Sequence, residues 1–276
     1  MSLTHDLQYA TDLARAAGKI ILNQYGKVER LTKTHAAATD EAVTEADRAS
    51  QRSIVAGLRV RYPDDGLVGE ESETGESITF ESNNPRGRHW VIDPIDGTNN
   101  FIAGLGNFCV CIGLIDEGYP VLGVVYDVTR DVMYAAARGQ GAWANGKRVT
   151  VPSTPLDESS MIMFTSNLLI QNRCPEWACK FLAQQNWKLR ILGSAALEAT
   201  YVAAGVAHGA VTVNGKLWDA AAAAALVLEA GGVMTDLKGQ PIFPFDLTRY
   251  AGAKVPFLAA PPQDHRPLLD LILAHP

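Results

Sequence analysis

Apolar residues recur at helical spacing near the start of the 276-residue chain. Residues 4–25 have an apolar side chain every three or four positions, which predicts one helix. A second helix is expected to begin near Thr44, where Thr44-Glu45-Ala46-Asp47 forms a capping-box pattern with Asp in place of the usual Glu. It should end at Tyr62-Pro63, and the Thr- and Ala-rich residues 32–41 between the two helices are expected to form a loop.

The pattern changes to short apolar runs after residues 71–88, a stretch rich in Glu, Ser, Asn and Gly that predicts an exposed loop. The runs cover residues 89–92, 108–115, 121–128, 132–137 and 142–143. Their close spacing, and turn signals such as Asn145-Gly146 after the last run, indicate antiparallel hairpins.

From about residue 153 onward, apolar runs alternate with longer helical patterns. Strands are predicted at residues 161–164, 188–192, 207–213, 233–235 and 257–260, and helices at 175–185, 193–204, 218–230 and 266–274. Strands that alternate with helices imply a second α/β unit. We therefore expect an N-terminal α+β subdomain over residues 1–150 and a C-terminal α/β subdomain over residues 151–276.

The composition narrows the class of protein without identifying it. Hydrophobic residues make up 47% of the chain and charged residues 20%, as in an ordinary globular protein. The net charge of −6 argues against a general nucleic-acid-binding protein. No apolar run approaches the roughly eighteen residues of a membrane span, and no secretion signal opens the chain, so we expect a cytoplasmic protein that does not enter a membrane.

The four cysteines do not suggest a disulfide framework in a chain of this length. Cys109 and Cys111 alternate along a predicted strand, so both side chains should point to one face and lie in the core. Cys174 and Cys179 lie around a predicted helix start, without a second pair to complete a zinc site. The six histidines form no HExxH or HxH motif, which argues against a zinc enzyme.

The segment IDPIDGTNNF places Asp93 and Asp96 at the predicted end of a strand. Two carboxylates this close repel each other unless a proton or a cation lies between them. Their oxygen atoms suit a hard divalent cation such as Mg²⁺, and Pro94 would make rigid the turn on which they converge. Gly97 and Thr98 add backbone N–H groups and a hydroxyl, which together form a natural anion site. The alternative is an Asp-rich turn that caps a helix.

Three further acidic residues occupy positions from which they can join this pair. Glu70 follows the apolar Leu67-Val68 and so lies at another strand end, Asp219 opens a predicted helix, and Asp47 completes the capping box. Helix capping alone would explain Asp47 and Asp219 individually. Their joint occurrence with the central motif favours a metal site.

These motifs together resemble those of the inositol monophosphatase family, in the superfamily that also contains fructose-1,6-bisphosphatase. The matching segments are Val43-Thr44-Glu45-Ala46-Asp47, Gly69-Glu70-Glu71-Ser72, Trp90-Val91-Ile92-Asp93-Pro94-Ile95-Asp96-Gly97-Thr98-Asn99-Asn100-Phe101 and Trp218-Asp219-Ala220-Ala221. The resemblance extends from near residue 10 to near residue 260. The long central motif followed by a later Trp-Asp pair is highly specific.

The resemblance implies a layered αβαβα sandwich, a homodimer, inhibition by lithium, and hydrolysis of a small phosphate monoester with two to three Mg²⁺ ions per active site. The implied metal ligands are Glu70, Asp93 and the Ile95 carbonyl for the first ion, Asp93, Asp96 and Asp219 for the second, and Glu70 again for a third, weaker one. The implied catalytic residues are Asp47, Thr98 and Glu70, of which Asp47 and Thr98 would activate the attacking water. The backbone N–H groups of Gly97 and Thr98 would hold the phosphate.

The sequence does not identify the phosphate ester that the protein hydrolyses. Inositol-specific family members have a Glu seven residues before the Trp-Asp aspartate, where this chain has the uncharged Thr212. Ser166 and Ala195 are further candidates for the substrate pocket. Lys216 is either a solvated loop lysine or a cation that favours a second anionic group, and the role of Lys33 is open. Inositol phosphate, histidinol phosphate, a sugar phosphate and a 3′-phosphonucleotide are all candidate substrates.

Two other hypotheses account for part of the pattern. A dehalogenase-type phosphatase, which forms an aspartyl-phosphate, also uses paired aspartates, but it spaces them by one residue and needs no distant Glu70 or Asp219. A catalytically silent family member that binds a partner has no need of a full ligand set, and every expected ligand is present in this chain.

Overall fold

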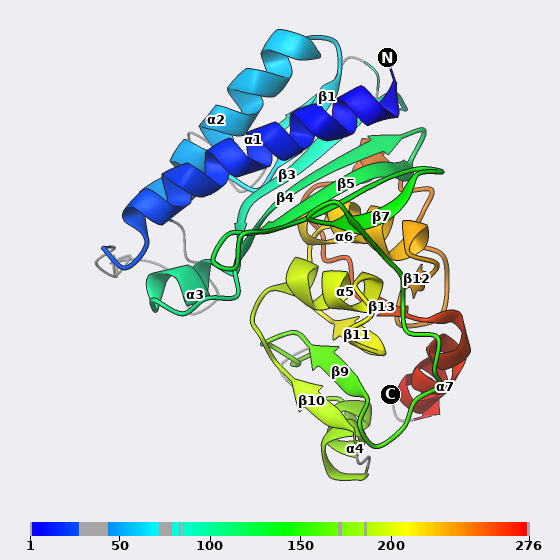
Figure 1. Ribbon diagram of the computed structural model, residues 1–276. Helices are drawn as coiled ribbons and strands as arrows, with labels where there is room; N and C mark the ends of the chain where they lie inside the picture. Colours follow the sequence, from blue (N-terminus) through cyan, green and yellow to red (C-terminus); the bar gives the residue numbers. More distant parts are fainter. Residues whose placement is uncertain are drawn as a thin grey trace.

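Helices α1 (Leu3–Gln24) and α2 (Glu45–Arg61) pack against each other and form an outer layer of the molecule (Figure 1). The computed structural model describes residues 2–27, 44–71, 79–82, 84, 86–170, 173–184 and 187–274. Helix α2 begins as predicted, because Thr44 and Asp47 form the capping box with hydrogen bonds in both directions. The loop expected at residues 32–41, which includes Lys33, lies outside the described residues.

Eight strands of the described chain form a large sheet against these helices, in the order β2-β1-β3-β4-β5-β6-β7-β8. The strands are β1 (Gly66–Gly69), β2 (Thr79–Glu81), β3 (His89–Asp96), β4 (Cys109–Asp116), β5 (Tyr119–Asp127), β6 (Val132–Ala137), β7 (Gly141–Ala144) and β8 (Lys147–Val149). The predicted antiparallel hairpins are confirmed from β4 to β7. The prediction of a loop throughout residues 71–88 is wrong at β2, which forms by pairing with β1, a contact that local composition does not reveal.

Strand β3 continues past its predicted end at Ile92 and reaches Asp96. Its pairing with β4 shifts register between Asp93 and Asp96, which marks an irregularity of the β-bulge type. The short helix α3 (Thr98–Ile102) follows directly, with Gly97 as its N-cap residue. The predicted turn of the central motif is therefore a bulged strand end that leads into a helix.

A second sheet of five described strands has the order β10-β9-β11-β13-β12. The strands are β9 (Met161–Phe164), β10 (Lys188–Arg190), β11 (Gly209–Thr212), β12 (Val233–Thr235) and β13 (Phe257–Ala260), and the helices of this part are α4 (Glu176–Gln184), α5 (Ala195–Ala203), α6 (Leu217–Glu229), η1 (Leu247–Arg249) and α7 (Pro262–Ala274). Helix α7 begins earlier than predicted, and Pro267 lies inside it. Because proline has no N–H, the Gln263 carbonyl lacks its usual helical partner at this position.

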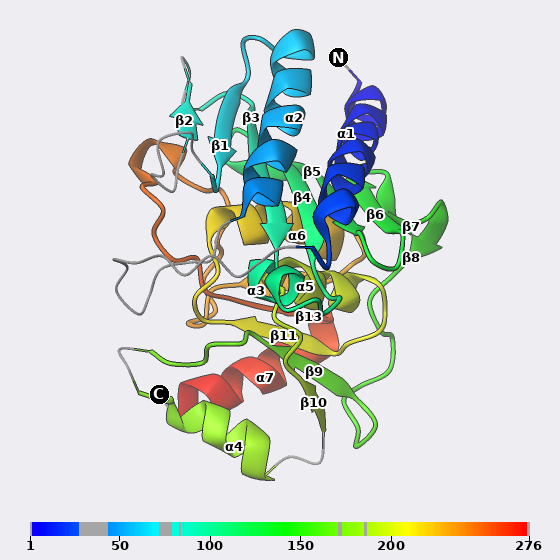
Figure 2. The ribbon, with the colours of Figure 1, turned by 90° about the vertical axis from the view of Figure 1, so that its left-hand side faces the viewer.

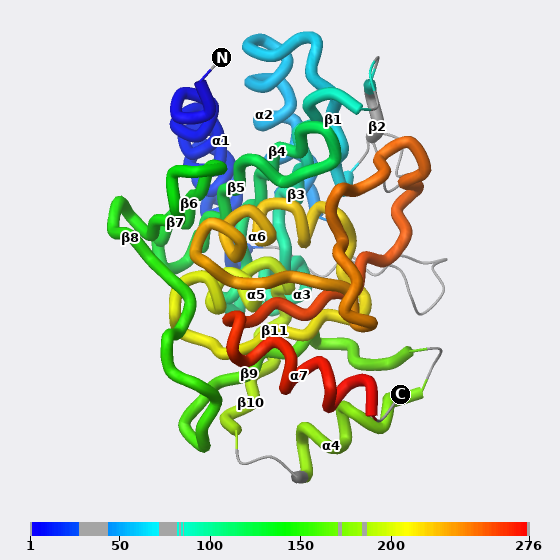
Figure 3. Tube along the Cα trace, turned by 90° about the vertical axis from the view of Figure 1, so that its right-hand side faces the viewer, coloured from blue at the N-terminus to red at the C-terminus, as the bar shows by residue number. Residues whose placement is uncertain are grey.

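The helices and sheets stack as five layers (Figures 2 and 3), and three hydrophobic cores of the described residues hold the layers together. One core joins α1 and α2 to the large sheet and includes Ile54 and Ile112. The second lies between the sheets, around α5 and α6, and includes Leu226. The third joins the small sheet to α4 and α7 through residues such as Phe164 and Phe181. The layers therefore form the αβαβα sandwich that the sequence predicts.

Helix α6 lies close to β4 and β5 because two facing strand positions, Gly113 and Gly123, have no side chain. A Cβ atom at Gly123 would lie 2.1 Å from the carbonyl oxygen of Ala222. The helix meets these glycines with the alanines of residues 220–225. This close packing fixes the first turn of α6, which carries Asp219, against the large sheet.

The large sheet uses residues 66–149 and the small sheet residues 161–260. We propose that the boundary near residue 150 separates two subdomains joined through α5 and α6. No helix of the described chain is long and apolar enough to cross a membrane.

Candidate active site

Three aspartates from the two halves of the chain meet beside the carboxyl end of β3. Ligand oxygen atoms of Asp93, Asp96 and Asp219 lie within 4.8 Å of one another. In a regular strand, side chains three positions apart point to opposite faces, so the register shift in β3 is what allows Asp93 and Asp96 to converge. The Asp219 carboxylate also accepts a hydrogen bond of 2.8 Å from the Lys216 N–H, as expected of a helix-capping residue. Asp219 therefore caps α6 and also lies close to Asp93 and Asp96.

The three aspartates line a cavity of about 330 Å³. The lining residues from the N-terminal half of the chain also include Glu70 and the segment from Ile95 to Asn100. Those from the C-terminal half include Thr165, Ser166, Gly193, Ala195, Asn214, Gly215, Lys216 and Trp218. This volume accommodates a phosphate group and a small organic alcohol.

The acidic wall of the cavity favours protonated carboxyl groups when no cation is bound. Burial raises the pKa of Glu70 well above its ordinary value, and repulsion by Asp219 raises it further. Burial likewise raises the pKa of Asp93, with added repulsion from Glu70 and Asp96. The pKa of Asp96 is raised by burial despite hydrogen bonds from Ser194 and Ala196 that favour its ionised form. At neutral pH a bound cation would remove this repulsion.

Asp47 and Thr98 form a second group beside the cavity. The Thr98 hydroxyl lies 3.2 Å from Oδ1 of Asp47 and 3.0 Å from the Ile95 carbonyl oxygen, so it can donate its proton to either one. Burial raises the pKa of Asp47 to about 6, although the hydroxyl and N–H of Thr44 donate hydrogen bonds to its carboxylate. A carboxyl group with this pKa changes its protonation close to neutral pH, as a general base must.

Gly97 joins β3 to α3 in a conformation that only glycine adopts easily, with φ of 101°. A Cβ atom there would lie 2.8 Å from the Asn107 carbonyl oxygen. The N–H groups of Gly97 and Thr98 belong to the first turn of α3, where backbone N–H groups have no acceptor within the helix. The cavity beside this turn therefore suits an anionic group.

The chain is similar in sequence and in structure to several known proteins. The sequence profile of the inositol monophosphatase family matches residues 2–270. The Nus factor SuhB of Pasteurella multocida is 36% identical over 236 residues, which cover 84% of this chain and 85% of the relative. A histidinol-phosphatase of Chlorobaculum parvum is 36% identical over 238 residues, which cover 86% of this chain and 88% of the relative. The solved structure of an inositol monophosphatase from Thermotoga maritima superposes with a TM-score of 0.81 at 31% identity, covering 98% of this chain and 97% of that one.

The chain belongs to the inositol monophosphatase family. It is therefore a phosphatase, a hydrolase that acts on phosphate monoesters. The fold expected from the resemblance is confirmed by the superposition on family structures. The relatives include a Nus factor and a histidinol-phosphatase, so membership of the family establishes the class of reaction but not the substrate.

Two of the three residues predicted to contact substrate line the cavity, namely Ser166 and Ala195. The third, Thr212, lies elsewhere: it is fully buried at the end of β11, outside the cavity lining. A Cβ atom at Gly215 would lie 2.7 Å from the Thr212 methyl group, so Thr212 packs beneath the wall that Gly215 forms. The position of Thr212 gives its predicted substrate contact no support, so the contact stays a prediction, whereas the neighbouring Asn214 does line the cavity.

Several residues that shape the site were not predicted from the sequence. Asn214 accepts a hydrogen bond of 2.7 Å from the Thr165 hydroxyl, and both residues line the cavity. Asn100 donates to the Leu192 carbonyl oxygen at 2.7 Å and so ties α3 to the segment before α5. Glu198, buried on α5, accepts hydrogen bonds from the N–H groups of the same segment at 2.8 and 3.1 Å. Glu198 is the one charged residue of α5, and this was the available signal for it.

Proposed function

We propose that the protein is a Mg²⁺-dependent phosphatase that hydrolyses a small phosphate monoester by direct attack of water. The observation that carries this proposal is the convergence of Asp93, Asp96 and Asp219 in a cavity that also contains Glu70. Like-charged buried carboxylates need a counter-charge at neutral pH, and their hard oxygen ligands suit Mg²⁺. The donor set therefore fits the metal that the family implies.

The metal ligands in this proposal are Glu70, Asp93, Asp96, Asp219 and the Ile95 carbonyl. When bound, Mg²⁺ supplies positive charge that stabilises the transferring phosphoryl group and the departing alkoxide. The N–H groups of Gly97 and Thr98 donate to the phosphate oxygens and orient the ester.

Asp47 and Thr98 activate the attacking water in this mechanism. The Thr98 hydroxyl takes a proton from water as it passes its own proton to Oδ1 of Asp47, which lies 3.2 Å away. Asp47 must be ionised for this transfer, and its pKa of about 6 leaves it ionised above that pH.

Direct attack by water is favoured over an aspartyl-phosphate. Asp93 accepts a hydrogen bond of 2.9 Å from the Ile95 N–H, and Asp96 accepts hydrogen bonds from Ser194 and Ala196. In this proposal both carboxylates are also occupied as metal ligands, which leaves them poorly placed to attack phosphorus. Trapping a phosphorylated aspartate during turnover would support the dehalogenase-type mechanism instead.

The substrate class that the cavity fits best is the phosphate monoester of a neutral polyol, such as an inositol monophosphate. Thr165, Ser166 and Asn214 offer uncharged donors and acceptors that suit hydroxyl groups. The ammonium group of Lys216 donates to the Gly252 carbonyl oxygen at 2.6 Å and lies over the Trp218 ring, so part of its bonding capacity is already used. The second candidate substrate, the runner-up, is an ester whose second anionic group replaces the Gly252 carbonyl as the partner of Lys216. A sugar bisphosphate and a 3′-phosphonucleotide are examples. Histidinol phosphate is a further candidate.

Phosphate release across a panel of esters tests this assignment. The panel contains an inositol monophosphate, histidinol phosphate, a sugar bisphosphate and a 3′-phosphonucleotide, each assayed with Mg²⁺ and with EDTA. We expect the highest kcat/KM for the polyol monoester, with Lys216→Met changing it less than threefold. A bisphosphate or phosphonucleotide that is preferred by wild type, and loses most of its kcat/KM in Lys216→Met, would support the runner-up.

The homodimer and lithium sensitivity expected from the resemblance stay predictions.

A further inference from the structure

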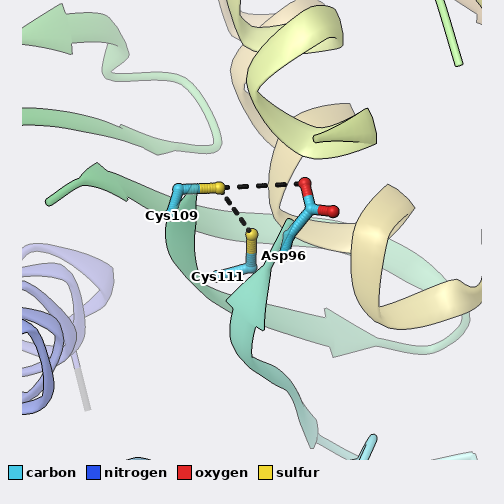
Figure 4. Close-up of side chains that lie close together, drawn as sticks. All are labelled: Asp96, Cys109 and Cys111. Atoms are coloured by element: carbon cyan, nitrogen blue, oxygen red, sulfur yellow. Dashed lines mark hydrogen bonds between the residues drawn. The ribbon is translucent and has the colours of Figure 1, made fainter. Parts of the chain in front are cut away.

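A pair of buried thiols lies directly behind one of the proposed metal ligands. Cys109 and Cys111 alternate along β4, so both side chains point to the face where Asp96 ends β3 (Figure 4). The Sγ atoms of the two cysteines are 3.6 Å apart, and Sγ of Cys109 is 3.8 Å from Oδ2 of Asp96. The exposed fraction of both cysteines is 0%, as expected of core residues. The group is therefore a compact set of two sulfur atoms and one oxygen.

Two of the separations in this group, Sγ–Sγ and Cys109 Sγ–Asp96 Oδ2, are within about 0.3 Å of those between ligands of one tetrahedral zinc ion. With Zn–S bonds of about 2.3 Å, two thiolates on one ion lie about 3.8 Å apart. With a Zn–O bond of about 2.0 Å, the sulfur and oxygen ligands lie about 3.5 Å apart. A ligand atom from each of Asp96, Cys109 and Cys111 lies within 4.8 Å of the others, so an ion can replace the two thiol protons with little movement.

The surroundings supply a fourth candidate ligand atom, the hydroxyl oxygen of Ser194, and a route to the group. Oγ of Ser194 lies 3.6 Å from Sγ of Cys109 and donates to Oδ2 of Asp96 at 2.5 Å. Asp96 lines the cavity, so an ion that enters the cavity reaches the group through this carboxylate. Thiolates select soft or borderline ions such as Zn²⁺ and Cd²⁺, whereas the all-oxygen group of Asp93, Asp96 and Asp219 suits Mg²⁺.

We propose that Asp96, Cys109 and Cys111 form a second metal site, which binds Zn²⁺ and is distinct from the Mg²⁺ site. Binding releases two thiol protons to solvent and forms two Zn–S bonds and one Zn–O bond, with no change of oxidation state. The two sites share Asp96, so Zn²⁺ on its Oδ2 atom withdraws that carboxylate from Mg²⁺. Inhibition by Zn²⁺ follows from this competition and rests on the proposed function, whereas Zn²⁺ binding itself does not.

Cobalt spectroscopy tests the site without an activity measurement. Co²⁺ bound to thiolates gives a sulfur-to-metal charge-transfer band, which Co²⁺ in an all-oxygen site lacks. The exposed Cys174 and Cys179, whose Sγ atoms are 3.8 Å apart, are a competing source of such a band. The matched variants are therefore Cys109→Ala/Cys111→Ala and Cys174→Ala/Cys179→Ala, each of which retains two of the four cysteines.

Without added Mg²⁺, we expect the Co²⁺ band in the Cys174→Ala/Cys179→Ala protein and its loss when Zn²⁺ is added, whereas any band in Cys109→Ala/Cys111→Ala can come only from Cys174 and Cys179. The concentration of Zn²⁺ that halves phosphate release should rise at least tenfold in Cys109→Ala/Cys111→Ala. A Cys174→Ala/Cys179→Ala protein without the band overturns the proposal, and this protein alone decides the matter if the other variant fails to fold. A band with no Zn²⁺ inhibition would leave the site in place and contradict the proposed role of Asp96.

Discussion

The Thr98 hydroxyl lies 3.2 Å from Oδ1 of Asp47, although the two residues are 51 positions apart. This contact joins the first turn of α2 to the first turn of α3. Each residue has a local structural task, because Asp47 completes the capping box and Thr98 begins α3. Their contact adds a path for a proton from the cavity to a buried carboxylate.

Asp47→Asn should lower kcat by about 10²–10⁴-fold, because an amide cannot accept the proton that water loses. The variant should still fold, since Asp47 is the N3 residue of the capping box and the Asn side-chain carbonyl can still accept the hydrogen bond from the Thr44 N–H. Glu45→Gln is the matched control: Glu45 lies in the same helix turn but is exposed and paired with Arg52. Steady-state phosphate release measures both variants. An Asp47→Asn protein with more than a tenth of wild-type kcat would remove Asp47 from the mechanism.

The stability of the metal-free protein should fall as pH rises through the raised pKa values of the cavity. Burial raises the pKa of Asp47 from 3.8 to about 6 and raises those of Glu70, Asp93 and Asp96. A raised pKa in the folded state gives stability that is present below the unfolded pKa and lost as pH rises through the folded pKa. For Asp47 this window is about pH 4 to 6.

The measurement is the difference in Tm between Mg²⁺ and EDTA at a series of pH values. His89 and His265 have pKa values lowered by burial, which oppose this trend, but their effect cancels in the difference. We expect the Mg²⁺-dependent increase in Tm to grow from pH 5 to pH 7.5, because protons and Mg²⁺ compete for the same carboxylates. An increase that is independent of pH would contradict a carboxylate metal site.

Glu198 offers a test of how the segment before α5 is held. Its Oε1 atom accepts hydrogen bonds from the N–H groups of Leu192 and Gly193, and burial raises its pKa well above the ordinary value. Glu198→Gln keeps both acceptor contacts and should retain activity and stability within about threefold and 1 kcal/mol. Glu198→Ala leaves two buried N–H groups without this acceptor and should destabilise by about 2–4 kcal/mol in urea unfolding. Equal unfolding midpoints for the two variants would show that Glu198 does not hold this segment.

Gly123→Ala should weaken Mg²⁺ binding although Gly123 is not a ligand. The added Cβ would lie 2.1 Å from the Ala222 carbonyl oxygen, so α6 must move away from β5 and carry Asp219 with it. Overpacking of this kind costs about 1–3 kcal/mol of stability. The readout is the Mg²⁺ concentration for half-maximal activity, which should rise while urea unfolding stays cooperative. An unchanged Mg²⁺ dependence would show that α6 tolerates the shift without moving Asp219.

Much of the fold follows from local signals, and the parts that do not are set by contacts between distant segments. The capping box, the hairpins and the alanine-rich α6 each have a signature within a few residues, so they were predicted closely. The extension of β3 to Asp96 needs pairing with β4, and β2 needs pairing with β1. Neither pairing has a local signature.

The candidate site divides in the same way. Its acidic residues lie in specific motifs, so their convergence was foreseeable. The residues of the substrate wall were not foreseeable, because counting seven residues back from Asp219 assumes a particular backbone path for the intervening residues. Close packing of Gly215 over Thr212 buries the threonine and leaves Asn214 in the cavity lining. Glu198 and Asn100 act through backbone groups of residues 192–193 and 107, which no sequence motif connects to them.

The most direct test of the central claim is the Mg²⁺ dependence of phosphate release by wild type and Asp93→Asn. Asp12→Asn is the control, since Asp12 is an exposed aspartate on α1 that contacts Gln8. We predict no release in EDTA, full recovery of wild type and Asp12→Asn with Mg²⁺, and a kcat for Asp93→Asn that is at least about 10²-fold lower at saturating Mg²⁺. Wild-type release that persists in EDTA, or an Asp93→Asn protein that responds to Mg²⁺ as wild type does, would contradict the account.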